Sequence, residues 1–227
     1  GCALWDRIFP AGTEDETPAQ LMIEGTESMN NGYYEAASEA FQKIRDRYPY
    51  SKYAVEAELK MADALYKSKH YQEAIEAYDT FEKLHPKHPE IPYVIYKKGM
   101  SHFSQVKSID RDQSHTHSAK EEFTRLIRRF PEDAYAKKAE KHLRECYISL
   151  AEHELYVGHF YFNSGDYRAA MNRYRYVLEN YPDLGQYHIA LEYLRKSKMR
   201  LDQESPEGSS AAEANRSWWD RLLHPFQ

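Results

Sequence analysis

The fold is decided by residues 158–182, which read GHFYFNSGDYRAAMNRYRYVLENYP. A glycine stands first, a tyrosine follows nine residues later, and Ala170 and Tyr174 lie four apart before the closing Pro182. Residues four apart meet on one face of a helix, and proline cannot continue a helix. A small first residue lets two helices approach closely. The stretch therefore predicts two helices that pack as a hairpin.

The same pattern occurs four times along the chain. The alanine, aromatic and proline sets are Ala37/Phe41/Pro49, Ala74/Tyr78/Pro86, Ala119/Phe123/Pro131 and Ala170/Tyr174/Pro182, and the small residues before them are Gly25, Ala62, Gly99 and Gly158. This spacing is typical of tetratricopeptide hairpins, which stack because one hairpin cannot bury its own apolar face. Unrelated amphipathic helices would have to reproduce the spacing four times. The sequence thus predicts an all-α tetratricopeptide solenoid of about ten helices in one superhelix.

Some segments depart from the regular repeat of ~34 residues. A polar insert, residues 107–115, separates the two helices of the third repeat. From about Ala134, apolar residues at helical spacing fill the gap before the fourth repeat, which predicts either an extra helix or one helix that merges with that repeat. Tyr187 to Leu201 reads as a closing helix, and Ser51 and Asp133 are predicted N-caps.

These elements give four predicted regions along the chain. Residues 1–17 form a lipidated N-terminus and tether, 18–201 the solenoid, 202–217 a disordered linker rich in Ser, Glu, Ala and Gly, and 218–227 a Trp-rich segment.

The two ends share the tripeptide Trp-Asp-Arg, at Trp5–Arg7 and Trp219–Arg221. We interpret both ends either as aromatic anchors at a membrane interface or, for the C-terminal segment, as a docking element for a partner groove. Coincidence is the remaining alternative.

Composition limits the possible functions. The net charge is −5 and the isoelectric point about 6.1, with Lys and Arg spread along the helices, which argues against a nucleic-acid surface. With 30% charged residues and a mean hydropathy of −0.86, no stretch is expected to span a bilayer.

Catalytic motifs are absent from the sequence. It contains no GxSxG, P-loop, HExxH or CxxC pattern, so we expect neither an enzyme nor a cofactor. His115 and His117 lie near Asp110 and Asp112 in the insert, but such a pair needs further ligands, and no metal site is expected.

The two cysteines differ in their surroundings. Cys146 falls on an apolar helical stripe and is expected to be a buried small hydrophobe. Cys2, in Gly1-Cys2-Ala3, resembles the end of a bacterial lipobox, where the cysteine becomes the lipidated N-terminus. The alternative is an ordinary free cysteine. Alanine at position 3 resembles lipoproteins sorted to the outer membrane.

Solenoid repeats bind ligands on the face lined by their first helices. In the repeat register, the inward positions there are Met22, Met29, Leu59, Tyr66, Tyr93, Tyr96, Met100 and Phe103, followed by Leu155, His159 and Phe162. Methionine and aromatic side chains suit an adaptable groove for an apolar or aromatic peptide. The alternative is that several of them pack between adjacent hairpins.

With its lipobox-like Cys2, this repeat layout resembles the BamD family of helical-repeat lipoproteins, over roughly residues 18–201. The most specific stretch runs from Asp110-Arg111-Asp112-x-x-His115 through Ala119 and Phe123 to Phe130-Pro131, and resembles that family's third-repeat loop.

The resemblance implies a non-catalytic subunit of the β-barrel assembly machine, held by acylated Cys2 at the periplasmic face of the outer membrane. It implies that the N-terminal half recognises targeting signals of unfolded outer-membrane proteins, which end in an aromatic residue. It also implies docking on a POTRA domain of the barrel subunit BamA, beside other assembly-machine lipoproteins. We assign that docking surface to Tyr187, His188 and Arg195, together with Trp218 and Trp219 of the C-terminal segment.

Two other functions stay open. A pilotin-like repeat lipoprotein would guide a secretin to the outer membrane, although the Asp-Arg-Asp insert speaks against it. A periplasmic coordinator of envelope constriction would share the Pro-x-Ser-x-Tyr-Ala start of residues 49–54, but usually carries a coiled-coil segment that this sequence lacks.

Overall fold

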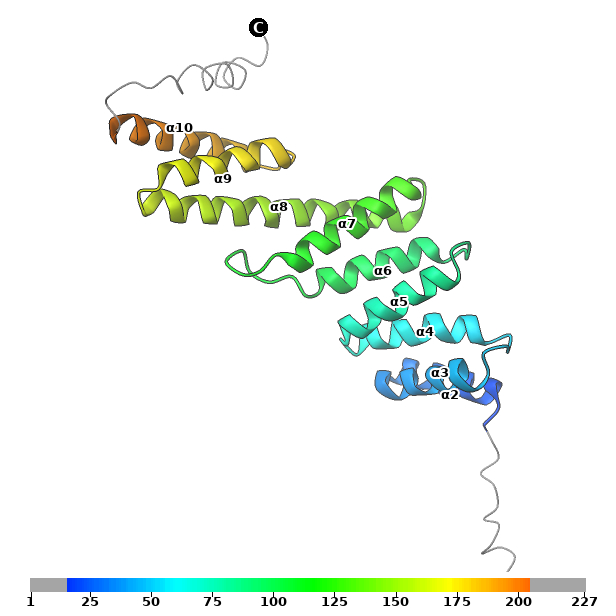
Figure 1. Cartoon of the computed structure of the whole chain (residues 1–227). Coiled ribbons are helices and arrows are strands. Elements are labelled where there is room, and N and C mark those ends of the chain that lie inside the picture. Colours follow the sequence, from blue (N-terminus) through cyan, green and yellow to red (C-terminus); the bar gives the residue numbers. More distant parts are fainter. Residues whose placement is uncertain (1–15, 205–227) are drawn as a thin grey trace, which may run out of the picture. The chain divides into compact units, whose positions relative to one another are not determined.

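The computed structural model describes residues 16–204, and these form nine helices and no strand (Figure 1). The helices are α2 (Pro18–Asn31), α3 (Tyr34–Arg47), α4 (Ala54–Lys67), α5 (Tyr71–Leu84), α6 (Ile91–Phe103), α7 (Ser114–Arg129), α8 (Ala134–Asn163), α9 (Tyr167–Asn180) and α10 (Tyr187–Glu204). The chain divides into two compact units whose boundary falls between Cys146 and Tyr147, inside α8. The predicted all-α repeat architecture is confirmed.

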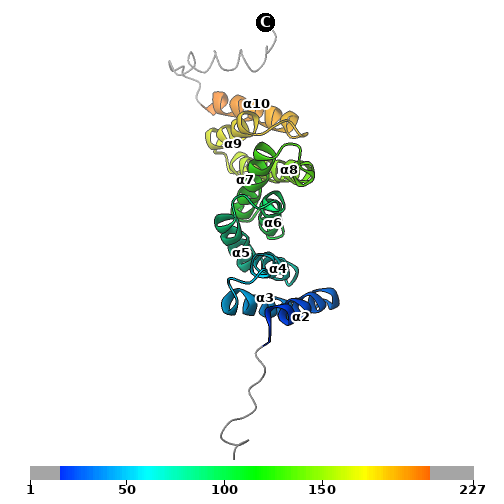
Figure 2. The same ribbon diagram turned by 90° about the vertical axis from the view of Figure 1, so that its right-hand side faces the viewer.

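The first unit stacks three hairpins and the beginning of α8. Each helix from α2 to α6 packs against the next one along the chain, as the ribbon viewed from the side shows (Figure 2). One apolar cluster lies among α2, α3 and α4, centred on Leu21, Phe41 and Ile44. A second cluster joins α4 through α8 and includes Cys146, which is fully buried as predicted.

The second unit consists of the end of α8 with α9 and the closing helix α10. Its core holds Leu150, Tyr174 and Val177, with Ala190 and Leu194 of α10 packed against them. The predicted closing helix is therefore present, and it continues to Glu204. Residues 202–204, which the sequence placed in the linker, are helical.

A contact between a glycine and an aromatic ring sets the spacing of three hairpins. A Cβ atom placed on Gly25 would lie 2.5 Å from Cε1 of Phe41, and one on Gly99 would lie 2.5 Å from Cε1 of Phe123. At Gly158 the distance to Cε1 of Tyr174 would be 2.6 Å. Each ring therefore packs directly on the backbone of the first helix, as the sequence pattern predicted.

The irregular segments resolve as follows. Between the repeats, α8 is one continuous helix of 30 residues, so the merged-helix alternative is correct. The loop 104–113 accommodates the third-repeat insert, although the last two residues assigned to it, Ser114 and His115, already belong to α7. Longer first-to-second-helix loops of this kind add little entropic cost and leave the hairpin packing intact.

One predicted N-cap is confirmed and the other is wrong. The backbone N–H of Tyr135 donates to Oδ1 of Asp133 at 2.7 Å, which caps α8. Ser51 does not cap α4, because a turn closed by the N–H of Ala54 and the carbonyl of Ser51 intervenes before the helix begins. The Ser51 hydroxyl is buried and has no hydrogen-bond partner among the described residues.

We expect Gly99→Ala to destabilise the protein. The added methyl would overlap the Phe123 ring and cost about 1–3 kcal/mol, more than the helix propensity that alanine gains over glycine. Urea unfolding measures the difference. If the Phe123 ring causes the clash, Gly99→Ala should destabilise the F123L variant less than it destabilises the parent. A G99A variant as stable as the parent would contradict the contact.

Candidate functional site

The predicted groove residues fall into three groups. Leu155, His159 and Phe162 belong with the core of the second unit. Six pack around the core that joins α4 to α8: Leu59 and Tyr66 from α4, and Tyr93, Tyr96, Met100 and Phe103 from α6. Met22 and Met29 of α2 belong to the separate cluster of the first hairpin. Met22 is 8% exposed, so it is mainly a core side chain there.

Four half-buried rings, Tyr66, Tyr93, Tyr96 and Phe103, form what we call the aromatic surface. The start of α8 extends it, since the Tyr135 ring centroid lies 5.2 Å from that of Tyr93 and 5.4 Å from that of Tyr96. These rings come from the first helices of successive hairpins. The surface is therefore continuous across α4, α6 and α8.

The carboxylate of Asp63 adjoins the aromatic surface at Tyr93. Oδ1 of Asp63 accepts hydrogen bonds from the hydroxyls of Tyr78, at 2.5 Å, and Tyr93, at 2.6 Å. Burial, and then the charge of Asp63, raises the pKa of both tyrosines, so both remain neutral donors. The carboxylate thereby fixes the Tyr93 ring in the aromatic surface.

A lysine that sequence reasoning missed lies against these rings. The Nζ atom of Lys97 is 3.3 Å from the centroid of the Tyr66 ring and 6.0 Å from that of Tyr93. No carboxylate among residues 16–204 lies within ion-pair distance of this amine. Burial lowers the pKa of Lys97 to about 8, while Asp63 partly offsets that effect and Lys67 adds to it.

The next residue, Lys98, has the opposite surroundings. It is 6% exposed, and its amine lies 2.8 Å from Oδ1 of Asp79, 3.5 Å from Oε2 of Glu82 and 3.3 Å from Oε1 of Glu122. Arg125 also donates to Glu82, at 2.9 Å. This network ties α6 to α5 and α7, and against the effect of burial its hydrogen bonds and charges keep the pKa of Lys98 above its usual value.

Two cavities flank the first hairpins. One of about 360 Å³ lies between α2 and α4 and is lined by Met22, the exposed Ile23 and Tyr53. The other, of about 350 Å³, lies among α3, α4 and α5, with Met61 and Phe81 in its lining. The sequence did not indicate the second cavity, because helix packing rather than a motif creates it.

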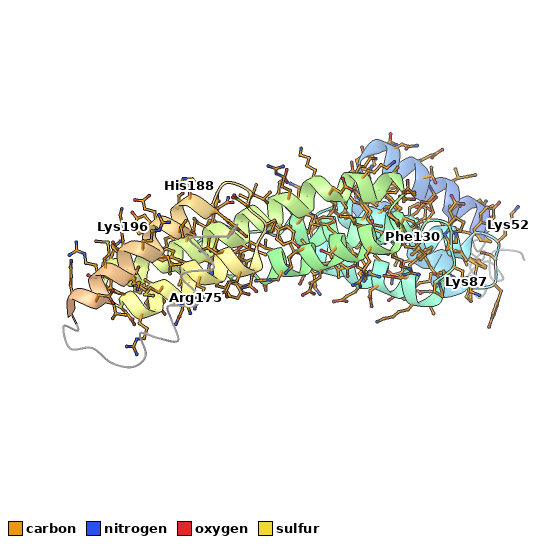
Figure 3. The ribbon with its side chains drawn as sticks, turned by 90° about the horizontal axis from the view of Figure 1, so that it is seen from above. Lys52, Lys87, Phe130, Arg175, His188 and Lys196 are labelled. Carbon is orange, nitrogen blue, oxygen red and sulfur yellow. The ribbon has the colours of Figure 1, made fainter. Side chains whose placement is uncertain are left out.

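The predicted docking residues on α10 have different roles. The hydroxyl of Tyr187 donates to the carbonyls of Leu178, at 3.0 Å, and Tyr181, at 2.6 Å, and so holds the loop between α9 and α10. His188 and Arg195 are exposed and seven residues apart, which places them on one face of the helix. Figure 3 shows His188 projecting from α10.

The remaining predicted sites lie beyond the described residues. Cys2, Trp218 and Trp219 fall outside residues 16–204. Between those limits no helix combines the length and apolar character needed to cross a membrane. Over the same range, no three His, Cys, Asp or Glu side chains gather into a group that could hold a metal ion.

Comparison with known proteins assigns the family. The model of YfiO, described as an outer membrane lipoprotein, matches residues 14–213. This chain belongs to that family. Assembly factor BamD of Rickettsia prowazekii is 32% identical over 81% of this chain and 73% of its own length. BamD of Neisseria meningitidis serogroup B is 28% identical over 84% of this chain and 75% of its own length. The resemblance to the BamD family drawn from the sequence is confirmed.

Solved structures add less. A tetratricopeptide protein of Thermus thermophilus aligns with 82% of this chain and 99% of its own, at 18% identity and a TM-score of 0.42. That similarity is too low to add to what the helices themselves show. The family match ends at residue 213, so the segment 218–227 with its paired tryptophans lies outside it.

The two adjacent lysines of α6 should respond in opposite directions to replacement by methionine. Lys97→Met should stabilise the fold at pH 7, because it removes a half-buried ammonium that no carboxylate of residues 16–204 pairs. Lys98→Met should cost about 3–5 kcal/mol, because it leaves Asp79, Glu82 and Glu122 crowded together with one cation fewer.

The Lys97 effect should also depend on pH. The unfolded chain binds a proton at this amine up to about pH 10.5, whereas the folded chain binds it only up to about pH 8. The amount by which the Lys97 ammonium destabilises the folded state therefore falls as the pH rises between those values. Urea unfolding of K97M and parent at matched pH should show a gain that shrinks above pH 8. A gain that grows with pH, or a K97M variant less stable than the parent at pH 7, would contradict this account.

Proposed function

We propose that this chain is a lipoprotein subunit of the machinery that assembles β-barrels in the outer membrane. Membership of the YfiO family and the relatives named outer membrane protein assembly factor BamD support the assignment. In this proposal the protein is a scaffold rather than an enzyme, and it uses no cofactor. The covalent lipid on Cys2 holds it at the periplasmic face of the outer membrane.

The aromatic surface is the single observation that carries the proposed role. Tyr66, Tyr93, Tyr96 and Phe103 present half-buried rings along the first helices, and burying such rings supplies much of the energy of a peptide interface. Unfolded outer-membrane proteins with an aromatic last residue offer matching side chains. We therefore assign recognition of their targeting signals to this surface.

A second surface, on α10, is proposed to hold a POTRA-bearing barrel subunit, beside other lipoproteins of the machine. His188 and Arg195 are exposed there on one face, and Tyr187 fixes the adjoining loop through its two hydrogen bonds. This assigns substrate recognition and partner docking to separate compact units of the chain.

Truncating the rings should weaken peptide binding. Tyr66→Ala and Phe103→Ala should each reduce affinity about tenfold for a peptide that ends in phenylalanine, since central aromatic residues dominate such interfaces. Fluorescence anisotropy gives the affinity and circular dichroism checks folding. Tyr50→Ala, which removes a fully exposed ring, is the control and should have no effect. A folded Y66A/F103A double variant with undiminished binding would refute the assignment.

Charge reversal on α10 should release the barrel partner. His188→Glu with Arg195→Glu replaces two exposed side chains and should lower recovery of a POTRA-bearing protein about tenfold when the native complex is purified in mild detergent. Quantitative mass spectrometry measures the recovery. Lys87→Glu, at an exposed loop position of the first unit, is the matched control. Equal recovery from both variants would place the docking surface elsewhere.

A further inference from the structure

Lys97 contacts the aromatic surface without an ion pair, since no carboxylate of residues 16–204 lies within ion-pair distance of its amine. Its amine lies on the Tyr66 ring, whereas the neighbouring Lys98 contacts three carboxylates. Asp63 attracts Lys97 but is already the acceptor for the hydroxyls of Tyr78 and Tyr93. A half-buried ammonium without a paired anion is energetically costly. The position therefore favours an anionic ligand.

A second lysine adds to the positive charge. Lys67, the last residue of α4, repels the charge of Lys97, and its own amine lies 5.5 Å from the centroid of the Tyr34 ring. It makes no ion pair among the described residues. Around Lys97, the charge of Lys67 opposes that of Asp63, the one carboxylate that acts on the Lys97 amine, while Glu90 acts on Tyr93 and Tyr135.

The surrounding rings define what carries the anion. A free inorganic anion would gain nothing from the half-buried rings of Tyr66, Tyr93 and Tyr96 beside the amine, and a phosphate is better matched by arginine forks. A terminal carboxylate next to an aromatic residue satisfies both features, because its ring covers the tyrosines while its charge reaches the amine. The end of a peptide chain combines the two groups within one residue.

We propose that Lys97, supported by the charge of Lys67, binds the terminal carboxylate of a polypeptide whose last residue is aromatic. This inference rests on the proposed function and names the chemical group that the surface reads. It makes recognition depend on a free chain end, because an internal aromatic residue carries no carboxylate. A polypeptide extended beyond its aromatic end would lose this contact.

The test uses the intact chain and a fluorescein-labelled peptide of alternating apolar and polar residues that ends in phenylalanine, prepared as the free acid and as the amide. Anisotropy at pH 7 should give about tenfold tighter binding of the acid, the value of one charge-assisted hydrogen bond. Lys97→Met should reduce binding of the acid to that of the amide and leave the amide unchanged. Lys97→Arg, which keeps the charge, should retain most of the preference.

Lys52→Met is the matched control, since that amine also stacks on a tyrosine, 5.0 Å from the centroid of Tyr53, but outside the aromatic surface. It should leave both affinities unchanged. Equal binding of acid and amide by the parent, or equal loss of both in K97M, would overturn the carboxylate contact. If Y66A and F103A still weakened binding of both peptides, the proposed function would stand without the carboxylate contact. If neither peptide bound the parent, the proposed function and the carboxylate contact would both be refuted.

Discussion

The close contact between a first-helix glycine and a second-helix ring is the constraint on which the other features depend. With Phe41, Phe123 and Tyr174 seated on the backbones of Gly25, Gly99 and Gly158, each hairpin has one allowed separation. Where Ala62 takes the glycine position, the Tyr78 ring is also fully buried, and its hydroxyl reaches Asp63. Because the separation of the two helices in a hairpin is set in this way, hairpins stack with their first helices side by side. The aromatic surface results from that stacking.

The same packing explains why adjacent residues of α6 differ so much. Lys98 faces the second helices α5 and α7, where Asp79, Glu82 and Glu122 neutralise it. Lys97 faces α4, where it meets a tyrosine ring instead. We expect Lys98 to stabilise the stack and Lys97, whose half-buried ammonium has no ion pair among residues 16–204, to cost stability at neutral pH. Lys97 therefore lies on the surface to which we assign peptide recognition.

Sequence reasoning recovered the parts of the molecule that depend on local spacing. The Gly25 to Phe41 and Gly158 to Tyr174 intervals predicted the hairpin contacts, and Asp133 was correctly placed as a cap. It could not predict Lys97, because the difference from Lys98 depends on helices distant in the sequence. It also misplaced the cap at Ser51, since an extra turn before α4 leaves no pattern that distinguishes it from a helix start.

The central claim is that the aromatic surface receives the chain ends of unfolded outer-membrane proteins. It is tested most directly by placing a photo-crosslinking phenylalanine analogue at Tyr66 in the intact chain and irradiating growing cells. The account predicts crosslinks to the C-terminal segments of barrel proteins, and none when the same analogue replaces the fully exposed Tyr50. Crosslinks confined to Tyr50, or crosslinks from Tyr66 to interior segments of barrel proteins, would contradict it.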